Sequence, residues 1–328
     1  MIKLSKSNIS DQSCDSEGGA VISLRNLAKI LVVIILWAIC YPLITTGLDA
    51  FSPFHFATLR SLIAGVSLLV AGIMLKKSII PERATWPGLV IISLTFTSLG
   101  FTGMFLAGGR VTPGLATVIA NVQPLLAALL SYFFLTERLC RASGLALLVG
   151  FLGIVVIAYP GFTEQSSNST PVGIALVLVG ATGVAIGNVI LKNIANLVDP
   201  LIAMAWILLI GAIPLAIAAS VFESENTMHW SPTSIINLLV LSIFGTALAF
   251  LWWLDLLRRI DLNVLNAYTF LTPVLALFIG LLFYSEQLLL IEWFGVAIIV
   301  FAVFLASRIT RVTSPSSIQI SNTDKNDV

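Results

Sequence analysis

The chain has 328 residues, of which 58% are hydrophobic and only 10% are charged, and its formal net charge is +1. A typical soluble domain has about 25% charged residues, and its surface could not hide this much apolar side chain. The composition therefore excludes a water-soluble globular protein and indicates an integral membrane protein. The small net charge gives no reason to expect a nucleic-acid partner.

Ten apolar runs follow one another along the chain, each long enough to cross the core of a bilayer. A helical span needs about 20 apolar residues, and these runs are too long and too little alternating for strands. The expected fold class is therefore all-α, with ten transmembrane helices. They are predicted at residues 30–48, 54–75, 87–107, 113–135, 143–160, 172–191, 200–221, 234–256, 263–284 and 289–307.

Polar segments flank and divide these predicted helices. Residues 1–26 lack the apolar core of a signal peptide, and they are expected to be a disordered cytoplasmic tail, as are residues 308–328. Residues 161–170, GFTEQSSNST, have no apolar periodicity and predict an external linker. The chain is thereby divided into two halves of five helices each, residues 27–160 and 171–307.

The distribution of basic residues predicts the orientation in the membrane. With the N-terminus in the cytoplasm, fifteen of the 17 Lys and Arg residues fall in cytoplasmic segments. Arg110 alone falls in an outer loop, and Arg60 lies within the second predicted helix. Both termini are therefore expected in the cytoplasm, and a plasma membrane, preferably a bacterial inner membrane, is the expected location.

The two halves share a sequence pattern at an offset of 149 residues. NVQPLLAALLSYFFLTERL, residues 121–139, returns in altered form as FLTPVLALFIGLLFYSEQL, residues 270–288. The matches include residue types that are rare in apolar sequence: Arg110 and Arg259, Pro124 and Pro273, Glu137 and Glu286. Because five is odd, two copies of a five-helix unit must cross the membrane in opposite directions. Such inverted repeats, around a central site at the midplane, are typical of secondary transporters.

Two segments resemble the EamA-type branch of the drug/metabolite transporter superfamily. They are VTPGLATVIANVQPLLAALLSYFFLTERLCRASGLALLVGFLGIVVI and LNVLNAYTFLTPVLALFIGLLFYSEQLLLIEWFGVAIIVFAVFLA. In both, a proline-bearing helix runs to a glutamate and then to a glycine-containing helix, and Trp37 and Arg60 also match family positions. The resemblance covers residues 27–307. It implies ten helices, cytoplasmic termini, a central cavity, and amino acids, other small metabolites or drugs as substrates. Where a counterpart of Trp37 would be expected, the second half has Gly187 and Asn188.

Polar side chains form a stripe on one face of the fourth and of the ninth predicted helix. Thr117 and Asn121 in the fourth, and Asn266 and Thr269 in the ninth, each precede a proline. We expect both stripes to line the cavity and to offer hydrogen-bonding groups to a polar substrate. Hydrogen bonds that only pack the helices together are the alternative.

Aromatic side chains accompany these stripes. Trp37 and Tyr41 share a face of the first helix, and Tyr268 adjoins the ninth-helix stripe, so all three are candidates for stacking an aromatic or cationic substrate. Ordinary core packing is the alternative, and it is the preferred interpretation for Trp253. Asn188 in the sixth helix is a secondary candidate for the cavity wall.

Three charged residues lie in or beside the predicted helices. Arg60, inside a helix, could attract a carboxylate substrate, but a structural clamp is the preferred interpretation, because a lone charge in lipid is costly. Glu137 and Glu286 lie at helix ends, where capping of the following helix is preferred over proton coupling. The predicted helices carry no Asp or Glu deep within them, so the coupling mode stays open.

The sequence thus predicts a secondary transporter that moves a small polar metabolite, preferably an amino acid or a related compound, outward by alternating access. A multidrug efflux transporter is the alternative. A membrane-embedded enzyme is disfavoured, because His55 and His229 are the only histidines and no catalytic motif accompanies them. Three separated cysteines predict no metal site, and no cofactor is expected. The expected partners are the substrate and the bilayer, with a homodimer left open.

Overall fold

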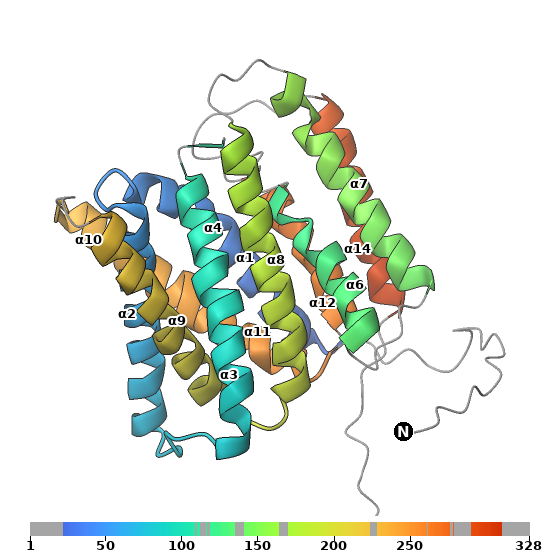
Figure 1. The fold of residues 1–328 in the computed structure, drawn as a ribbon. Helices are drawn as coiled ribbons and strands as arrows, with labels where there is room; N and C mark the ends of the chain where they lie inside the picture. The colour runs from blue at the N-terminus through green and yellow to red at the C-terminus, as the bar shows by residue number, and fades with distance from the viewer. Residues whose placement is uncertain are drawn as a thin grey trace, which may run out of the picture.

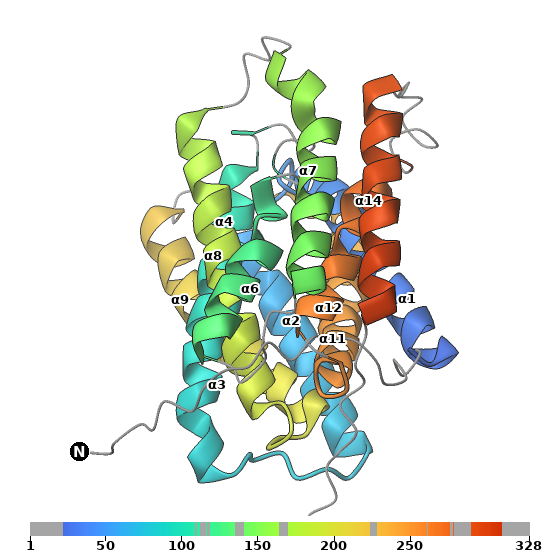
Figure 2. The same cartoon turned by 90° about the vertical axis from the view of Figure 1, so that its right-hand side faces the viewer.

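The computed structural model is helical throughout the part of the chain it describes, in which no β-strand occurs (Figures 1 and 2). The described residues are 22–108, 110–111, 116, 119–134, 141–163, 170–223, 228–260, 262–275, 278 and 290–309. Outside them lie almost all of both predicted tails, the middle of the predicted linker, and Thr117, Glu137 and Glu286. The backbone of Tyr41 is described, but its side chain is not.

The helices keep the labels of Figure 1. In chain order they are α1 (Leu24–Gly47), α2 (Pro53–Met74), η1 (Arg83–Thr85), α3 (Trp86–Ile92), η2 (Ser93–Leu99), α4 (Gly100–Ala107), α6 (Gln123–Phe134), α7 (Arg141–Thr163), α8 (Pro171–Ile194), α9 (Pro200–Phe222), α10 (Pro232–Ser242), η3 (Ile243–Leu248), α11 (Ala249–Leu257), α12 (Leu262–Thr269) and α14 (Leu290–Ile309). Three helices extend into the predicted polar segments. The first helix begins within the predicted N-terminal tail, because Ser23 caps it by accepting a hydrogen bond from the Asn26 amide. α7 extends into the predicted linker as far as Thr163, and α14 ends at Ile309, within the predicted C-terminal tail.

Six helical stretches within the described residues are long and apolar enough to cross a membrane. They coincide with the first, second, third, sixth, seventh and eighth predicted spans. Three shorter apolar stretches, Gly144–Gly153, Val264–Leu275 and Trp293–Ala302, fall in the fifth, ninth and tenth. The chain is therefore an all-helical protein of the multi-pass membrane type.

Four of the long helices start with the same sequence signal, a capping residue followed by proline. Proline suits the first helical position because its missing N–H is not needed there. The four pairs are Ser52–Pro53, Thr170–Pro171, Asp199–Pro200 and Ser231–Pro232. At α2 the cap comes from the end of α9: the Glu223 carboxylate accepts hydrogen bonds from the amides of Phe54 at 2.9 Å and His55 at 3.0 Å.

The third helix of each half contains a π-helical segment at its centre. These segments, η2 and η3, end at Leu99 and Leu248, which are 149 residues apart. Hydroxyl groups support the wider turn in both: Ser98 donates to the carbonyl of Ser93 at 3.2 Å, and Thr246 donates to that of Leu241 at 2.9 Å. Each bond reaches back five residues, the spacing of a π-helical turn.

The fourth and ninth helices are interrupted, although the sequence predicts each as one continuous span. The described backbone leaves the helix at residues 121–122 and again at Phe270. Pro124 and Pro273 provide the physical reason, because a proline cannot donate to the carbonyl four residues earlier and its ring crowds that carbonyl. Both breaks therefore fall at equivalent places in the two halves.

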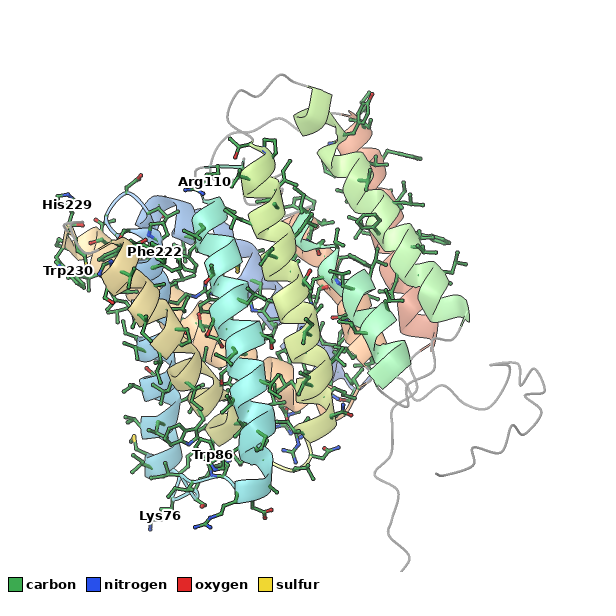
Figure 3. The ribbon with its side chains drawn as sticks, viewed as in Figure 1. Lys76, Trp86, Arg110, Phe222, His229 and Trp230 are labelled. Carbon is green, nitrogen blue, oxygen red and sulfur yellow. The ribbon has the colours of Figure 1, made fainter. Side chains whose placement is uncertain are left out.

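Helices of opposite halves pack against each other in the bundle. α2 lies along α9, and α7 lies along α14 at one edge of the molecule (Figures 1 and 2). α8 packs against α3, η2 and α4, and a Cβ added to Gly103 would come within 2.5 Å of the Gly180 Cα. Figure 3 shows Lys76 at one end of the bundle and Arg110 at the other, which fits their predicted assignment to loops on opposite sides.

Candidate functional site

A cavity of about 150 Å³ lies inside the helix bundle. Its wall is built by α1, α2, η2, α4, α8 and α11, together with residues on both sides of the two proline breaks. The lining residues are Trp37, Cys40, Arg60, Phe96, Phe101, Met104, Ala120, Asn121, Gln123, Val177, Gly180, Ala181, Val184, Asn188, Phe250, Trp253, Thr269 and Thr272. Among the described residues the wall is therefore largely apolar, with a few polar groups and one cation, Arg60.

Three of the predicted substrate contacts lie in this wall. Trp37 comes from α1, Asn121 from the break in the fourth helix, and Thr269 from the last residue of α12. The ring of Trp37 lies 5.0 Å from that of Trp253 and 6.0 Å from that of Phe250, between centroids. The structure thus brings together side chains that are far apart in the sequence.

Two other predicted contacts, Asn266 and Tyr268, are buried in α12 and are not among the lining residues. Thr269, at the break, faces the cavity, whereas Asn266 lies one turn earlier with 0% of its surface exposed. Neither amide atom of the Asn266 side chain has a hydrogen-bond partner in the described part of the chain. Both residues lie in α12, before the break at Phe270, so the predicted stripe faces the cavity only at its last residue.

Arg60 is a buried cation in the cavity wall, with 2% of its surface exposed. Its Nε donates a hydrogen bond of 2.6 Å to the Thr246 hydroxyl in η3. Its guanidinium carbon lies 4.6 Å from the ring centroid of Phe101, close enough for a cation–π contact. Arg60 therefore links α2 to η3 and at the same time forms part of the cavity surface.

Asn188 and Trp253 also belong to the wall, and each positions the other. The Trp253 indole Nε1 donates a hydrogen bond of 2.8 Å to the Asn188 Oδ1, and both residues are buried. The sequence predicted Asn188 as a secondary cavity residue and Trp253 as a packing residue. In the structure Trp253 does both: it packs in the core and it lines the cavity.

Equivalent positions of the two halves face this one cavity. Four pairs of lining residues are each separated by 149 positions: Phe101 and Phe250, Met104 and Trp253, Ala120 and Thr269, Gln123 and Thr272. None of these except Trp253 and Thr269 was singled out from the sequence. The 149-residue offset could have identified Gln123 and Thr272, because they immediately precede the matched prolines.

The chemistry of the wall suits reversible binding of a small molecule. Trp37 Nε1 and Thr272 Oγ1 are buried and have no hydrogen-bond partner in the described part of the chain, so they are available to a ligand or to water. Among the described residues no group of three or more His, Cys, Asp or Glu side chains is placed to hold a metal ion.

A bundle of apolar helices around a small cavity defines a multi-pass membrane protein with an internal cavity. The chain belongs to the EamA-like transporter family, whose sequence model matches residues 26–159 and again residues 171–308. The protein is therefore a membrane transporter by family.

Similar proteins include the uncharacterized transporter YvbV of Bacillus subtilis, which is 29% identical over 298 residues, 90% of this chain and 96% of that protein. The uncharacterized inner membrane transporter YedA of Escherichia coli is 27% identical over 275 residues, 83% of this chain and 87% of that protein. A solved crystal structure superposes with a TM-score of 0.74 at 22% identity, over 88% of this chain and 98% of that one. This last likeness concerns the fold alone.

Proposed function

We propose that the protein is a secondary transporter that exports a small polar metabolite, preferably an amino acid or a related compound, by alternating access. Residues 27–160 and 171–307 would form two inverted five-helix repeats that rock around the shared cavity. Ten helices, an external linker at residues 161–170, and cytoplasmic tails at residues 1–26 and 308–328 belong to the same proposal.

The main support for this proposal is the set of four lining pairs whose members are separated by 149 residues. Equivalent residues on two inverted halves would exchange environments when the cavity opens to the other side. The two π-helical segments and the two proline breaks lie at equivalent positions as well, and the family model matches the chain twice. Each half could therefore adopt the shape that the other has left, which gives two states of similar energy.

The size of the cavity favours a metabolite over a drug. Pockets for drug-sized ligands have volumes of about 300–1,000 Å³, whereas this cavity has about 150 Å³. The aromatic and apolar wall is the one observation that favours the alternative, a multidrug efflux transporter. The small volume is the stronger argument, because it suits a small ligand in this state.

The proposed substrate contacts are Trp37, Asn121, Thr269, Arg60 and Asn188, all of which line the cavity. We propose that Asn266 and Tyr268 contact substrate only when the cavity opens to the other side, since the buried Asn266 amide lacks a hydrogen-bond partner in the described part of the chain.

Four further predictions concern side chains that the structure does not describe. Tyr41 and Thr117 remain predicted substrate contacts, and Glu137 and Glu286 remain predicted helix caps.

The proposed location is a bacterial inner membrane, with both termini in the cytoplasm. The similar protein YedA is described as an inner membrane transporter, and the basic residues favour that orientation. The proposed partners are the substrate and the lipid, with a homodimer as an open possibility.

Efflux from cells or proteoliposomes tests the proposal directly. Proteoliposomes are loaded with labelled amino acids, nucleosides and cationic dyes, and efflux is followed with and without a pH gradient. We expect efflux of amino acids, and we expect Asn121→Ala to slow it. The matched control Asn193→Ala, on an exposed face of α8, should leave the efflux unchanged. Efflux of dyes alone would favour the multidrug alternative, and no protein-dependent flux of any compound would contradict the transport proposal.

A further inference from the structure

We propose, on the basis of the proposed transport function, that the C-terminal turn of α11 closes the cavity toward the end of the bundle assigned to the cytoplasm. Two lysines, Lys29 and Lys192, hold this turn in place. Alternating access requires the cavity to open to each side in turn, so the contacts of these lysines must break in one of the two states. We call the C-terminal turn of α11 and the two lysines the α11 gate.

The end of α11 attracts cations from both halves of the chain. The last carbonyls of a helix have no partner within it and carry partial negative charge. Lys192 Nζ donates hydrogen bonds of 2.7 Å to the carbonyls of Leu257 and Ile260, and Asp255, in the same turn, forms an ion pair with Lys29. Since Lys29 belongs to α1 and Lys192 to α8, one turn of α11 connects the first helices of the two halves.

These contacts lie directly beyond the cavity wall. Asn188 and Trp253 line the cavity and are joined by a hydrogen bond. Lys192 and Leu257 each follow four residues later, about one helical turn along the same two helices. α8 and α11 are therefore joined twice in succession, first within the wall and then at the helix ends. Any path from the cavity between these helices would have to separate both contacts.

The outer of the two contacts is surrounded by apolar side chains but can still be broken. Leu191, Leu257 and Ile260 are fully buried, each with 0% of its surface exposed, so a polar substrate cannot pass while they pack together. Lys192 itself is only partly buried, and a lysine stem is long enough to return its ammonium to water. The contact can therefore exchange its hydrogen bonds for water when the helices separate.

The first half lacks the side chains that make these contacts. At the offset of 149 residues, Met104 in α4 corresponds to Trp253 and Leu106 corresponds to Asp255. A thioether cannot donate a hydrogen bond, and leucine carries no charge. The first half thus builds the same helix without the polar contacts of α11, which favours a role for them in closing one side of the cavity over a requirement of the fold.

The native Cys40 can report on access to the cavity. It lines the cavity and has 3% of its surface exposed. When Cys14 and Cys140 are replaced by serine, it is the one cysteine left in the chain. The membrane-impermeant reagent 2-sulfonatoethyl methanethiosulfonate is added to inside-out vesicles, which expose the cytoplasmic side, or to spheroplasts, which expose the outer side. The rate at which Cys40 is labelled is measured from each side.

Substitution of Lys192 should open the α11 gate. Lys192→Met keeps most of the apolar stem but removes the donors, and we expect it to raise the labelling rate from the cytoplasmic side at least about tenfold. Lys192→Arg, which keeps N–H donors, should label more nearly like the parent protein. Lys77→Met is the matched control, because Lys77 pairs with Asp199 between α2 and α9, and it should leave the rate unchanged.

A second variant and the second side of the membrane keep the test decisive. Asp255→Asn weakens the contact with Lys29 and should raise labelling from the cytoplasmic side as well, which tests the gate even if Lys192→Met does not fold. Labelling from the outer side should not rise in either variant. An unchanged cytoplasmic rate in the folded variants, or an equal rise from both sides, would overturn the α11 gate, since an equal rise indicates general loosening.

The labelling needs no substrate, so failure of the gate and failure of the proposed function can be told apart. Efflux of amino acids by the parent protein, combined with parental labelling of Lys192→Met, would overturn the gate and leave the transporter intact. A one-sided rise in labelling without flux of any compound in proteoliposomes would support the gate and contradict the transport function.

Discussion

The indole nitrogen of Trp253 donates a hydrogen bond of 2.8 Å to the amide oxygen of Asn188, within the wall of the cavity. This bond joins α11 to α8 and fixes the orientation of the indole ring that packs against Trp37. Both residues are buried, with 2% of Asn188 and 3% of Trp253 exposed. Loss of the acceptor would therefore leave the indole N–H without a partner.

Asn188→Ala should destabilise the protein, because an unsatisfied buried donor costs about 1–3 kcal/mol. The measurement is the midpoint of thermal unfolding in detergent, together with the tryptophan fluorescence, which should change as the Trp253 ring reorients. Asn193→Ala makes the same substitution at an exposed position of the same helix and should have little effect. Equal midpoints for the two variants would contradict this role of Asn188.

Glu223 holds the N-terminus of α2, and its removal should loosen the contact between α2 and α9. Its carboxylate accepts from two α2 amides and from the Ser52 hydroxyl at 2.7 Å. Hydrogen bonds to a charged group contribute about 1.5–3 kcal/mol each, so we expect Glu223→Ala to lower the unfolding midpoint clearly. Glu82→Ala replaces an exposed glutamate that makes no cap and is the control. A midpoint for Glu223→Ala as high as that of the control would rule out this capping role.

Two ion pairs at helix ends should differ in strength because they differ in burial. Lys29 and Asp255 are each 18% exposed, whereas Lys77 and Asp199 are 36% and 37% exposed. Exposed pairs contribute only about 0.2–1 kcal/mol, so the Lys29–Asp255 pair should show the larger coupling energy. Double-mutant cycles with neutral substitutions, read from unfolding midpoints, measure both couplings. The reverse order would contradict the role of burial.

The close approach of α4 and α8 depends on glycine. A Cβ at Gly103 would come within 2.5 Å of the backbone of Gly180, so Gly103→Ala should separate the helices and lower the yield of folded protein. Gly88→Ala adds the same methyl group where the nearest side-chain atom lies at 3.4 Å, and we expect it to be tolerated. The yield after detergent extraction and the unfolding midpoint compare the two variants. A Gly103→Ala protein as stable as Gly88→Ala would show that the helices can adjust.

The proposed orientation predicts opposite labelling of two loops. The substitution Arg110→Cys is made in a variant in which Cys14, Cys40 and Cys140 are replaced. The new cysteine should react with an impermeant maleimide in intact cells. A cysteine at Arg83 should react only after the membrane is permeabilised. Both arginines are exposed in the structure. Labelling of Arg83→Cys alone in intact cells would reverse the orientation, and equal labelling of both would contradict the proposed topology.

Most of the helices could be predicted because a span imposes a length and a composition on the sequence. The interruptions at residues 121–122 and at Phe270 were not predicted, although Pro124 and Pro273 were recognised, because the apolar run continues through both prolines. The π-helical segments were not predicted either. Serine and threonine bonds to the preceding turn are common in ordinary helices, so their sequence carries no distinct signal.

The cavity was predicted only in part, for a related reason. Asn121 and Thr269 stand out as polar residues in an apolar sequence, and Trp37 as an aromatic residue in mid-helix. Phe96, Phe101 and Phe250 are equally close to the cavity, but in the sequence they look like any buried aromatic residue. Only the three-dimensional packing, or the offset between Phe101 and Phe250, distinguishes them from core residues.

The two proline breaks have one more consequence. Pro124 and Pro273 have no N–H, so the carbonyls of Ala120 and Thr269, four residues earlier, cannot complete the regular helical ladder. Both residues line the cavity, and their oxygens belong to the peptide chain itself. Replacing Ala120 or Thr269 by another amino acid would leave these two acceptors in place. This region can therefore stay polar while the surrounding side chains change. Such changes could adapt the protein to other substrates.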